Sequence, residues 1–113
     1  MALQKEIELE NGIILNYHRI TSLNKITNIS NNIEISSYTN ENQRLKEKAY
    51  QELQIKQING EELTEEEKVQ LEKGIDVFIY TEYINTPYDE NMTIENAYDY
   101  LKTINTYTNS LNI

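Results

Sequence analysis

The sequence has no cysteine and no tryptophan, and it contains only one proline, three glycines and one histidine. Without cysteine, neither a disulfide framework nor a thiolate metal site can form. Three glycines in this arrangement do not make a phosphate-binding loop. No apolar run approaches the roughly 18 residues of a membrane span, and the first residues lack the apolar segment of a signal peptide. We therefore expect synthesis in the cytoplasm, no export by a signal peptide and no membrane partner.

Basic residues are also scarce, because Lys and Arg number 10 against 19 Asp and Glu, for a net charge of −9. Proteins that bind nucleic acids use clustered Lys and Arg, so we expect no nucleic-acid partner. No feature indicates a small-molecule substrate. The length of 113 residues predicts one domain, and a hydrophobic content of 38% allows only a small core.

Tyrosine is abundant, with 9 residues against 1 phenylalanine. Tyrosine joins an apolar ring to a polar tip, so it suits both thin cores and protein interfaces. Composition alone leaves both interpretations open.

The N-terminal residues alternate with period two on both sides of Asn11-Gly12. Apolar or long side chains occupy every second position before and after this pair, at Leu3, Lys5, Ile7, Leu9, Ile13, Leu15 and Tyr17. Such alternation is typical of strands with one buried face. Asn-Gly favours a two-residue type I′ turn, in which both residues have positive φ. We predict a long β-hairpin.

A strand-like stretch continues from the hairpin to about Ile29 without Gly or Pro. A turn is predicted at 28–32 and another strand at 33–38. These segments predict an antiparallel meander over about residues 2–38.

The most apolar segment, 75–84, predicts a further strand. Apolar side chains on both of its faces favour an inner strand, which could pair with the first or the third strand. A loop is predicted at 83–92, and it contains the only proline, Pro87. The polar tail, 105–113, would need a neighbour to become ordered.

A helix is predicted over about 41–57, where apolar residues recur every four positions from Leu45. Thr39 or Asn40 can cap its start, and Asn59-Gly60 can end it. The prediction is therefore a change from strand to helix directly after the meander.

Thr64 and Glu67 have the spacing of a capping box, which predicts a second helix ending at Lys73-Gly74. The acidic run Glu61–Glu67 then fits a helix start, where acids are favoured; the alternative is a site for a cation or a basic partner. Thr93 can cap a final helix over about 94–104. Its predicted apolar stripe consists of Ile94, Ala97, Tyr98 and Leu101.

Together these elements predict an α+β fold. It comprises an antiparallel β-meander of about four strands, an inserted helical hairpin over about 41–73 and a C-terminal helix on one face of the sheet.

Few residues could carry chemistry. His18 could act as a general base, but it lies inside a predicted strand without a Ser–Asp pattern, which favours a structural role. Asp89, Glu90 and Asn91 offer oxygen ligands for calcium, or they form a turn before the last helix. We expect no catalytic residue, no cofactor and no metal site.

The tyrosines near Pro87 are the best candidates for a partner interface. Tyr98 and Tyr100 lie two apart on the predicted last helix, so they point in different directions and one of them should be near the surface. An aromatic loop beside it could anchor a partner; the alternative is a set of isolated surface tyrosines. The predicted interface residues are Tyr80, Tyr83, Pro87, Tyr88 and Tyr100.

Four segments, Gly12–Ile20, Ser37–Thr39, Val77–Tyr83 and Ala97–Thr103, resemble small proteins encoded by phages and prophages of Gram-positive bacteria. Genes of this group commonly lie in the late structural region, near tail and lysis genes. The resemblance covers most of the chain except Glu61–Gly74. It implies a virion or tail-associated context. The group has no established activity, so no site residue is carried over.

We therefore expect a non-enzymatic structural or adaptor component of a bacteriophage particle, associated with the tail or baseplate and located in the virion. Its expected partners are other virion proteins or further copies of itself. The alternative is a soluble phage-encoded regulator or inhibitor that binds a host protein through its acidic face. A third option is a small hydrolase that uses His18.

Overall fold

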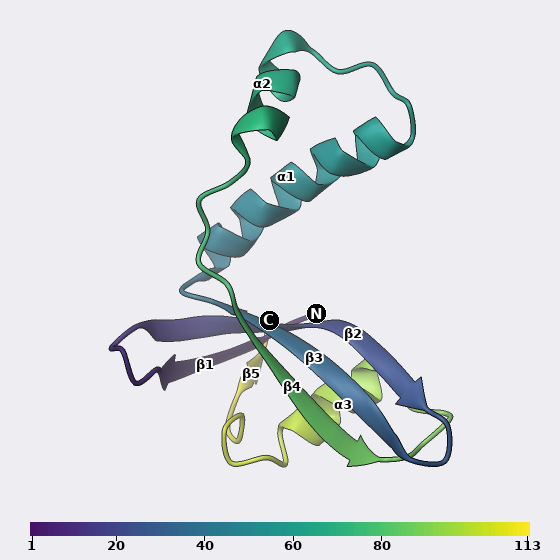
Figure 1. The fold of residues 1–113 in the computed structure, drawn as a ribbon. Coiled ribbons are helices and arrows are strands. Elements are labelled where there is room, and N and C mark those ends of the chain that lie inside the picture. The colour runs from purple at the N-terminus through teal and green to yellow at the C-terminus, as the bar shows by residue number, and fades with distance from the viewer.

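The computed structural model describes residues 1–113, which form five strands and three helices. In chain order these are β1 (Leu3–Glu8), β2 (Ile14–Ile26), β3 (Ser30–Tyr38), α1 (Glu41–Ile58), α2 (Glu65–Lys73), β4 (Tyr80–Pro87), α3 (Ile94–Leu101) and β5 (Leu111–Asn112). All strand pairs are antiparallel, and the sheet order is β4-β3-β2-β1-β5 (Figure 1). The predicted α+β class, inserted helical hairpin and C-terminal helix are confirmed.

The hairpin of β1 and β2 forms as predicted, but a register shift between Gln4 and Ile7 interrupts its alternation, so Leu3 pairs with His18 while Ile7 pairs with Leu15. Its turn also differs from the prediction. Gly12 has a φ of 87°, whereas Asn11 is not among the residues with positive φ. Leu9 donates its N–H to Ile13 O, and Gly12 donates its N–H to Leu9 O. The type I′ prediction was therefore wrong, because a longer loop with one left-handed glycine closes this hairpin.

The strand predicted at 75–84 is shifted and lies at a different place in the sheet. β4 begins at Tyr80 and pairs with β3 alone, so it is an edge strand and not an inner one. The first β4 pair joins Tyr80 to Ser37, next to the last residue of β3. The residues before Tyr80 have no strand to pair with because β3 has already ended. The predicted loop at 83–92 was also wrong over its first half, where the strand continues to Pro87.

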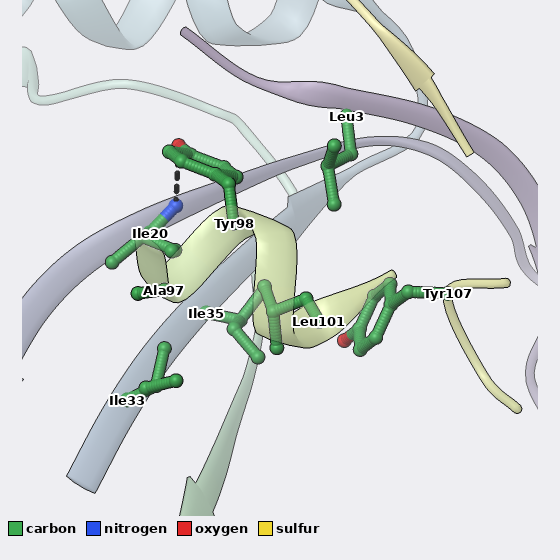
Figure 2. Close-up of a cluster of buried hydrophobic side chains, with 8 residues drawn as sticks. All are labelled: Leu3, Ile20, Ile33, Ile35, Ala97, Tyr98, Leu101 and Tyr107. Carbon is green, nitrogen blue, oxygen red and sulfur yellow. Dashed lines mark hydrogen bonds between the residues drawn. The ribbon is translucent and has the colours of Figure 1, made fainter. Parts of the chain in front are cut away.

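The core lies between α3 and one face of the sheet (Figures 1 and 2). Its eight buried residues are Leu3, Ile20, Ile33, Ile35, Ala97, Tyr98, Leu101 and Tyr107. α3 ends at Leu101, earlier than the predicted residue 104, and Ile94 from the predicted apolar stripe is 45% exposed. The buried part of the stripe is therefore Ala97, Tyr98 and Leu101.

The C-terminal tail, predicted to need a neighbour, is ordered by pairing with a strand of the same chain. β5 pairs with the start of β1, and Ala2 and Ile113 exchange backbone hydrogen bonds of 3.1 and 3.0 Å. This pairing is the fifth strand that the prediction of about four strands lacked. Tyr107, which precedes it, is 1% exposed and belongs to the core.

The helix caps agree with the sequence. Asn40 caps α1, while Thr64 and Glu67 form the predicted capping box of α2. Thr93 caps α3 through Asn96. None of the helices combines the length and the apolar character that a bilayer crossing requires.

Candidate interaction surfaces

The most exposed part of the molecule is the helical arm, defined here as residues 41–73. It leaves the sheet where β3 ends and returns where β4 begins, so it projects beyond the sheet (Figure 1). In α1 the only buried residue is Glu47, and α2 has none. Large apolar side chains are nevertheless exposed along the arm, at Leu45, Ile55, Ile58 and Val69. The arm is therefore a helical hairpin without a core of its own.

Few contacts hold the two helices of the arm together. Tyr50 donates its hydroxyl to Leu71 O at 3.2 Å, and Lys56 Nζ lies 3.2 Å from Glu67 Oε2. Between α1 and the residues after α2 lies a hollow of about 420 Å³, which Leu53 and Ile75 help to line. An arm that packs this loosely on itself offers apolar surface to another chain.

Glu47 anchors the arm to the sheet. Along β3, Ile33, Ile35 and Ser37 share the face that packs against α3. Tyr38 is the next residue after Ser37, so its side chain points to the opposite face. On that face Glu47, 8% exposed, accepts hydrogen bonds from Tyr38, from Arg19 at 3.4 Å and from Arg44 at 2.8 Å. Burial and the bond to Glu47 raise the pKa of Tyr38 to about 12. The base of the arm is thus tied down by charge, whereas its far end is free.

The outer edge of β4 is the second exposed surface. β4 pairs only with β3, so the N–H and C=O groups along its other edge have no strand partner in this chain. Exposed edges of this kind accept an additional strand. Six residues, 74–79, separate the end of the arm at Lys73 from the start of this edge at Tyr80.

The structure places the predicted interface residues in three locations. Tyr80 and Tyr83 are 40% and 61% exposed, and Pro87 ends the same strand. Tyr88 follows, half-buried, and Tyr100 packs against the core from α3.

Side-chain alternation separates these tyrosines further. Tyr80 lies opposite Ser37, on the α3 side of the sheet, whereas Tyr83 lies opposite Glu34 on the other side. The negative charge of Glu34 raises the pKa of Tyr83. The predicted residues therefore follow one edge, but they do not form a single aromatic patch.

His18 lies in a small buried polar cluster that sequence reasoning did not identify. His18 Nδ1 is 2.7 Å from Ser37 Oγ, and His18 Nε2 is 2.8 Å from Lys5 O. The carbonyl can only accept, so Nε2 carries the proton and Nδ1 accepts from Ser37. Burial lowers the pKa of His18, opposed by its bond to the Lys5 carbonyl and by the charge of Glu82. The imidazole is accordingly held neutral and in one tautomer.

Tyr107 and Glu82 complete this cluster from the other side. The ring centroids of His18 and Tyr107 are 5.5 Å apart in an edge-on arrangement, and Tyr107 donates its hydroxyl to Glu82 Oε2 at 3.1 Å. Burial, followed by the charge of Glu82, raises the pKa of the Tyr107 phenol. No local pattern in the sequence marks these residues, because strand pairing and the tail bring them together.

The His18–Ser37 pair has the spacing of a base and a nucleophile. Both side chains are at most 2% exposed. Ser37 lies in a strand that is paired on both sides, opposite His18 and Tyr80. Backbone N–H groups in such a strand are engaged in the sheet, so they do not form an oxyanion hole. The arrangement suits support of the sheet better than acyl transfer.

The loop before α3 has the geometry of a turn. Asp89 Oδ1 accepts from Asn91 N at 2.9 Å, and Asp89 O accepts from Asn31 Nδ2 at 2.9 Å. No group of three or more His, Asp or Glu side chains is placed to hold a metal ion. These contacts account for the acidic loop without a ligand.

Comparisons with protein-family models, with curated proteins and with solved structures find no match for this chain.

Proposed function

We propose that this protein is a non-enzymatic structural or adaptor component of a bacteriophage particle, associated with the tail or baseplate. The observation that carries the proposal is the helical arm. It extends from the sheet, buries no apolar side chain of its two helices and exposes several large ones. Apolar side chains displayed on such an extension mark a protein–protein contact. The particle context comes from the resemblance of four chain segments to phage-encoded proteins.

The free edge of β4 adds a second means of attachment. It follows the arm in the chain after residues 74–79, and it is the outer strand of the sheet. A strand added to β4 would gain backbone hydrogen bonds, and the alternating exposed Tyr83 would give it side-chain contacts. The proposed partners are other virion proteins or further copies of this chain.

Two measurements test this function together. Mass spectrometry of purified particles should detect the chain as a component, and sedimentation of the isolated protein should show self-association or a stable complex with another virion protein. A strict monomer that is also absent from purified particles would refute the proposal.

Paired variants locate the contact. Ile55→Gln with Ile58→Gln changes side chains that are 55% and 82% exposed at the free end of the arm, so folding should be unaffected while assembly is lost. Ile26→Gln with Ile29→Gln is the matched control, since these residues are 45% and 73% exposed at the opposite end of the sheet. Equal assembly of both variants would argue against the arm as the contact.

One observation favours the alternative of a host-directed regulator or inhibitor. At the free end of the arm, Glu61, Glu62, Glu65 and Glu66 are exposed. Such a cluster would suit a basic host protein. Recovery of one host enzyme in stoichiometric amount from host lysate, with no signal in particles, would favour this alternative.

A further inference from the structure

A small pocket lies on the α3 side of the sheet, beside the His18 cluster. We refer to it as the Glu82 pocket. It has a volume of about 190 Å³. Its polar lining residues are Glu82, His18, Ser37 and Thr106, and its apolar or aromatic ones are Ile7, Leu9, Leu15, Tyr80 and Tyr107. A neighbouring hollow of about 390 Å³ shares Leu9 and Tyr80 with it and continues to Phe78. Both hollows lie between the hairpin and the residues around the start of β4.

Glu82 makes no ion pair within this chain. Its carboxylate is half-buried, and its hydrogen-bond partner is the neutral hydroxyl of Tyr107. The ion pairs of the structure all join other residues. Lys5 is the basic residue near this cluster, but its ammonium is bound to Asn105 O and Thr108 O. A partly buried carboxylate without a counter-ion favours a cation from outside.

Five of the eight other lining residues are aliphatic or aromatic and suit an alkyl chain. Ile7, Leu9 and Leu15 supply aliphatic surface, while the rings of Tyr80 and Tyr107 supply aromatic surface on which a cation is also favourable. A group the size of a water molecule occupies about 30 Å³ in the liquid, so the pocket has room for about six such groups. A lysine side chain has five groups of this size, four methylenes and one ammonium, and therefore fits.

We propose that the Glu82 pocket binds the ammonium end of a lysine side chain presented by another protein of the particle. The ammonium would donate to the free oxygen of Glu82, and the methylene groups would lie between Leu9 and Tyr80. The wider hollow at Phe78 would then receive the neighbouring backbone of that protein. The identity of the lysine as a partner's residue rests on the proposed function; the preference of the pocket for an alkylammonium group does not.

His18 provides a single-residue reporter of binding, because it is the only histidine and its ring contacts Tyr107 in the pocket. The probes are the peptides acetyl-Gly-Lys-Gly-amide and acetyl-Gly-norleucine-Gly-amide, which differ in the ammonium group. We expect the lysine peptide to shift the His18 ring resonances in a saturable way and the norleucine peptide to leave them unchanged. Equal shifts with both peptides, or none with either, would overturn the proposal.

Variants separate the carboxylate from general charge. Glu82→Gln keeps the shape of the side chain and should weaken binding of the lysine peptide roughly tenfold or more, as expected for a hydrogen bond to a charged group. Glu6→Gln removes the same charge from an exposed position outside the pocket and should bind like the unchanged protein. Tyr80→Ala, at a 40% exposed side chain, should also weaken binding while the fold is retained. Unaltered affinity in both Glu82→Gln and Tyr80→Ala would refute the pocket as the site.

Butylammonium distinguishes the source of the amine. Saturable binding of butylammonium without binding of the lysine peptide would overturn the partner-lysine assignment, because a free amine alone would then fit. These titrations use the isolated protein, so their failure is distinct from absence of the chain in purified particles. Peptide binding by a protein that is absent from particles would refute the particle role and leave the pocket preference supported.

Discussion

Tyr98 joins the last helix to the first strand pair, and its hydroxyl offers a sharp test of how this small fold is stabilised. The side chain is 4% exposed. Its hydroxyl accepts from Ile20 N at 2.9 Å and donates to Met1 O at 2.9 Å (Figure 2 shows the bond to Ile20). The register that pairs Leu3 with His18 would place Met1 opposite Ile20. The Tyr98 hydroxyl therefore links the backbones of Met1 and Ile20 at a position where β1 and β2 do not pair directly.

Tyr98→Phe removes this bridge and keeps the ring in the core. Ile20 N–H would remain buried without a partner, which costs about 1 to 3 kcal/mol. Met1 is 72% exposed, so its carbonyl can bond to water and adds little. We expect a loss of about 2 kcal/mol in the free energy of unfolding. For a domain of this size, that loss lowers Tm by roughly 8 °C.

Urea unfolding followed by circular dichroism measures this difference. Tyr100→Phe is the matched control, because Tyr100 packs half-buried against the same core and its hydroxyl makes no hydrogen bond within the protein. Its effect should stay below roughly 0.5 kcal/mol. Amide exchange at Ile20 should accelerate in Tyr98→Phe alone. If both variants lose the same stability, the bridging hydroxyl does not carry the effect and the reasoning is refuted.

Three further predictions concern the arm and the His18 cluster. Glu47→Ala leaves Arg19 and Arg44 facing each other without a counter-charge, so it should destabilise the protein by about 2 kcal/mol and expose arm amides to hydrogen exchange, whereas Glu47→Gln should lose less. Burial lowers the pKa of His18 below 6.5, so the unfolded state binds more protons than the folded state. The urea concentration at the unfolding midpoint should therefore decrease as the pH is lowered below about 6.5; a pH dependence of this midpoint identical to that of His18→Gln would contradict this. The pKa of Tyr38, raised to about 12, should delay its titration in ultraviolet absorbance relative to the same residue in the unfolded protein, and stability should decline above about pH 10 as the unfolded phenol ionises first; titration of Tyr38 in the folded protein near the ordinary value of 10.0 would contradict the prediction.

Local features of this chain were predicted well because neighbouring residues decide them. The caps at Asn40, Thr64 and Thr93 depend on side chains within three residues of each helix start. The first hairpin likewise depends on residues close to Asn11-Gly12, although a register shift in β1 interrupts the alternation seen in the sequence. Such signals do not require knowledge of the rest of the fold.

Non-local features were not predictable in the same way. The apolar residues from Ile75 to Ile79 have the pattern of an inner strand, but β3 ends at Tyr38 and leaves them without a partner. The tail was expected to need an external neighbour, yet β1 supplies one. In both cases the outcome depends on where a distant strand begins or ends.

The candidate surfaces show the same contrast between features that the sequence predicts and features that depend on the fold. The exposed edge tyrosines could be named from the sequence, although their distribution over two faces of β4 could not. Glu82, Tyr107 and Ser37 carry no shared motif, and three separate segments bring them to His18.

The amino-acid sequence alone determined the three helices with their caps, the α+β class and the excess of negative charge, because these depend on residues close together in the chain or on composition. The tertiary structure decided which strand lies at the edge, that the helical arm projects from the sheet, and that Glu82 lines a pocket together with aliphatic and aromatic side chains. Those outcomes depend on pairing between strands far apart in sequence and on which surfaces the small core can cover. With few buried apolar residues to share, this chain covers one face of its sheet with α3 and leaves the arm exposed.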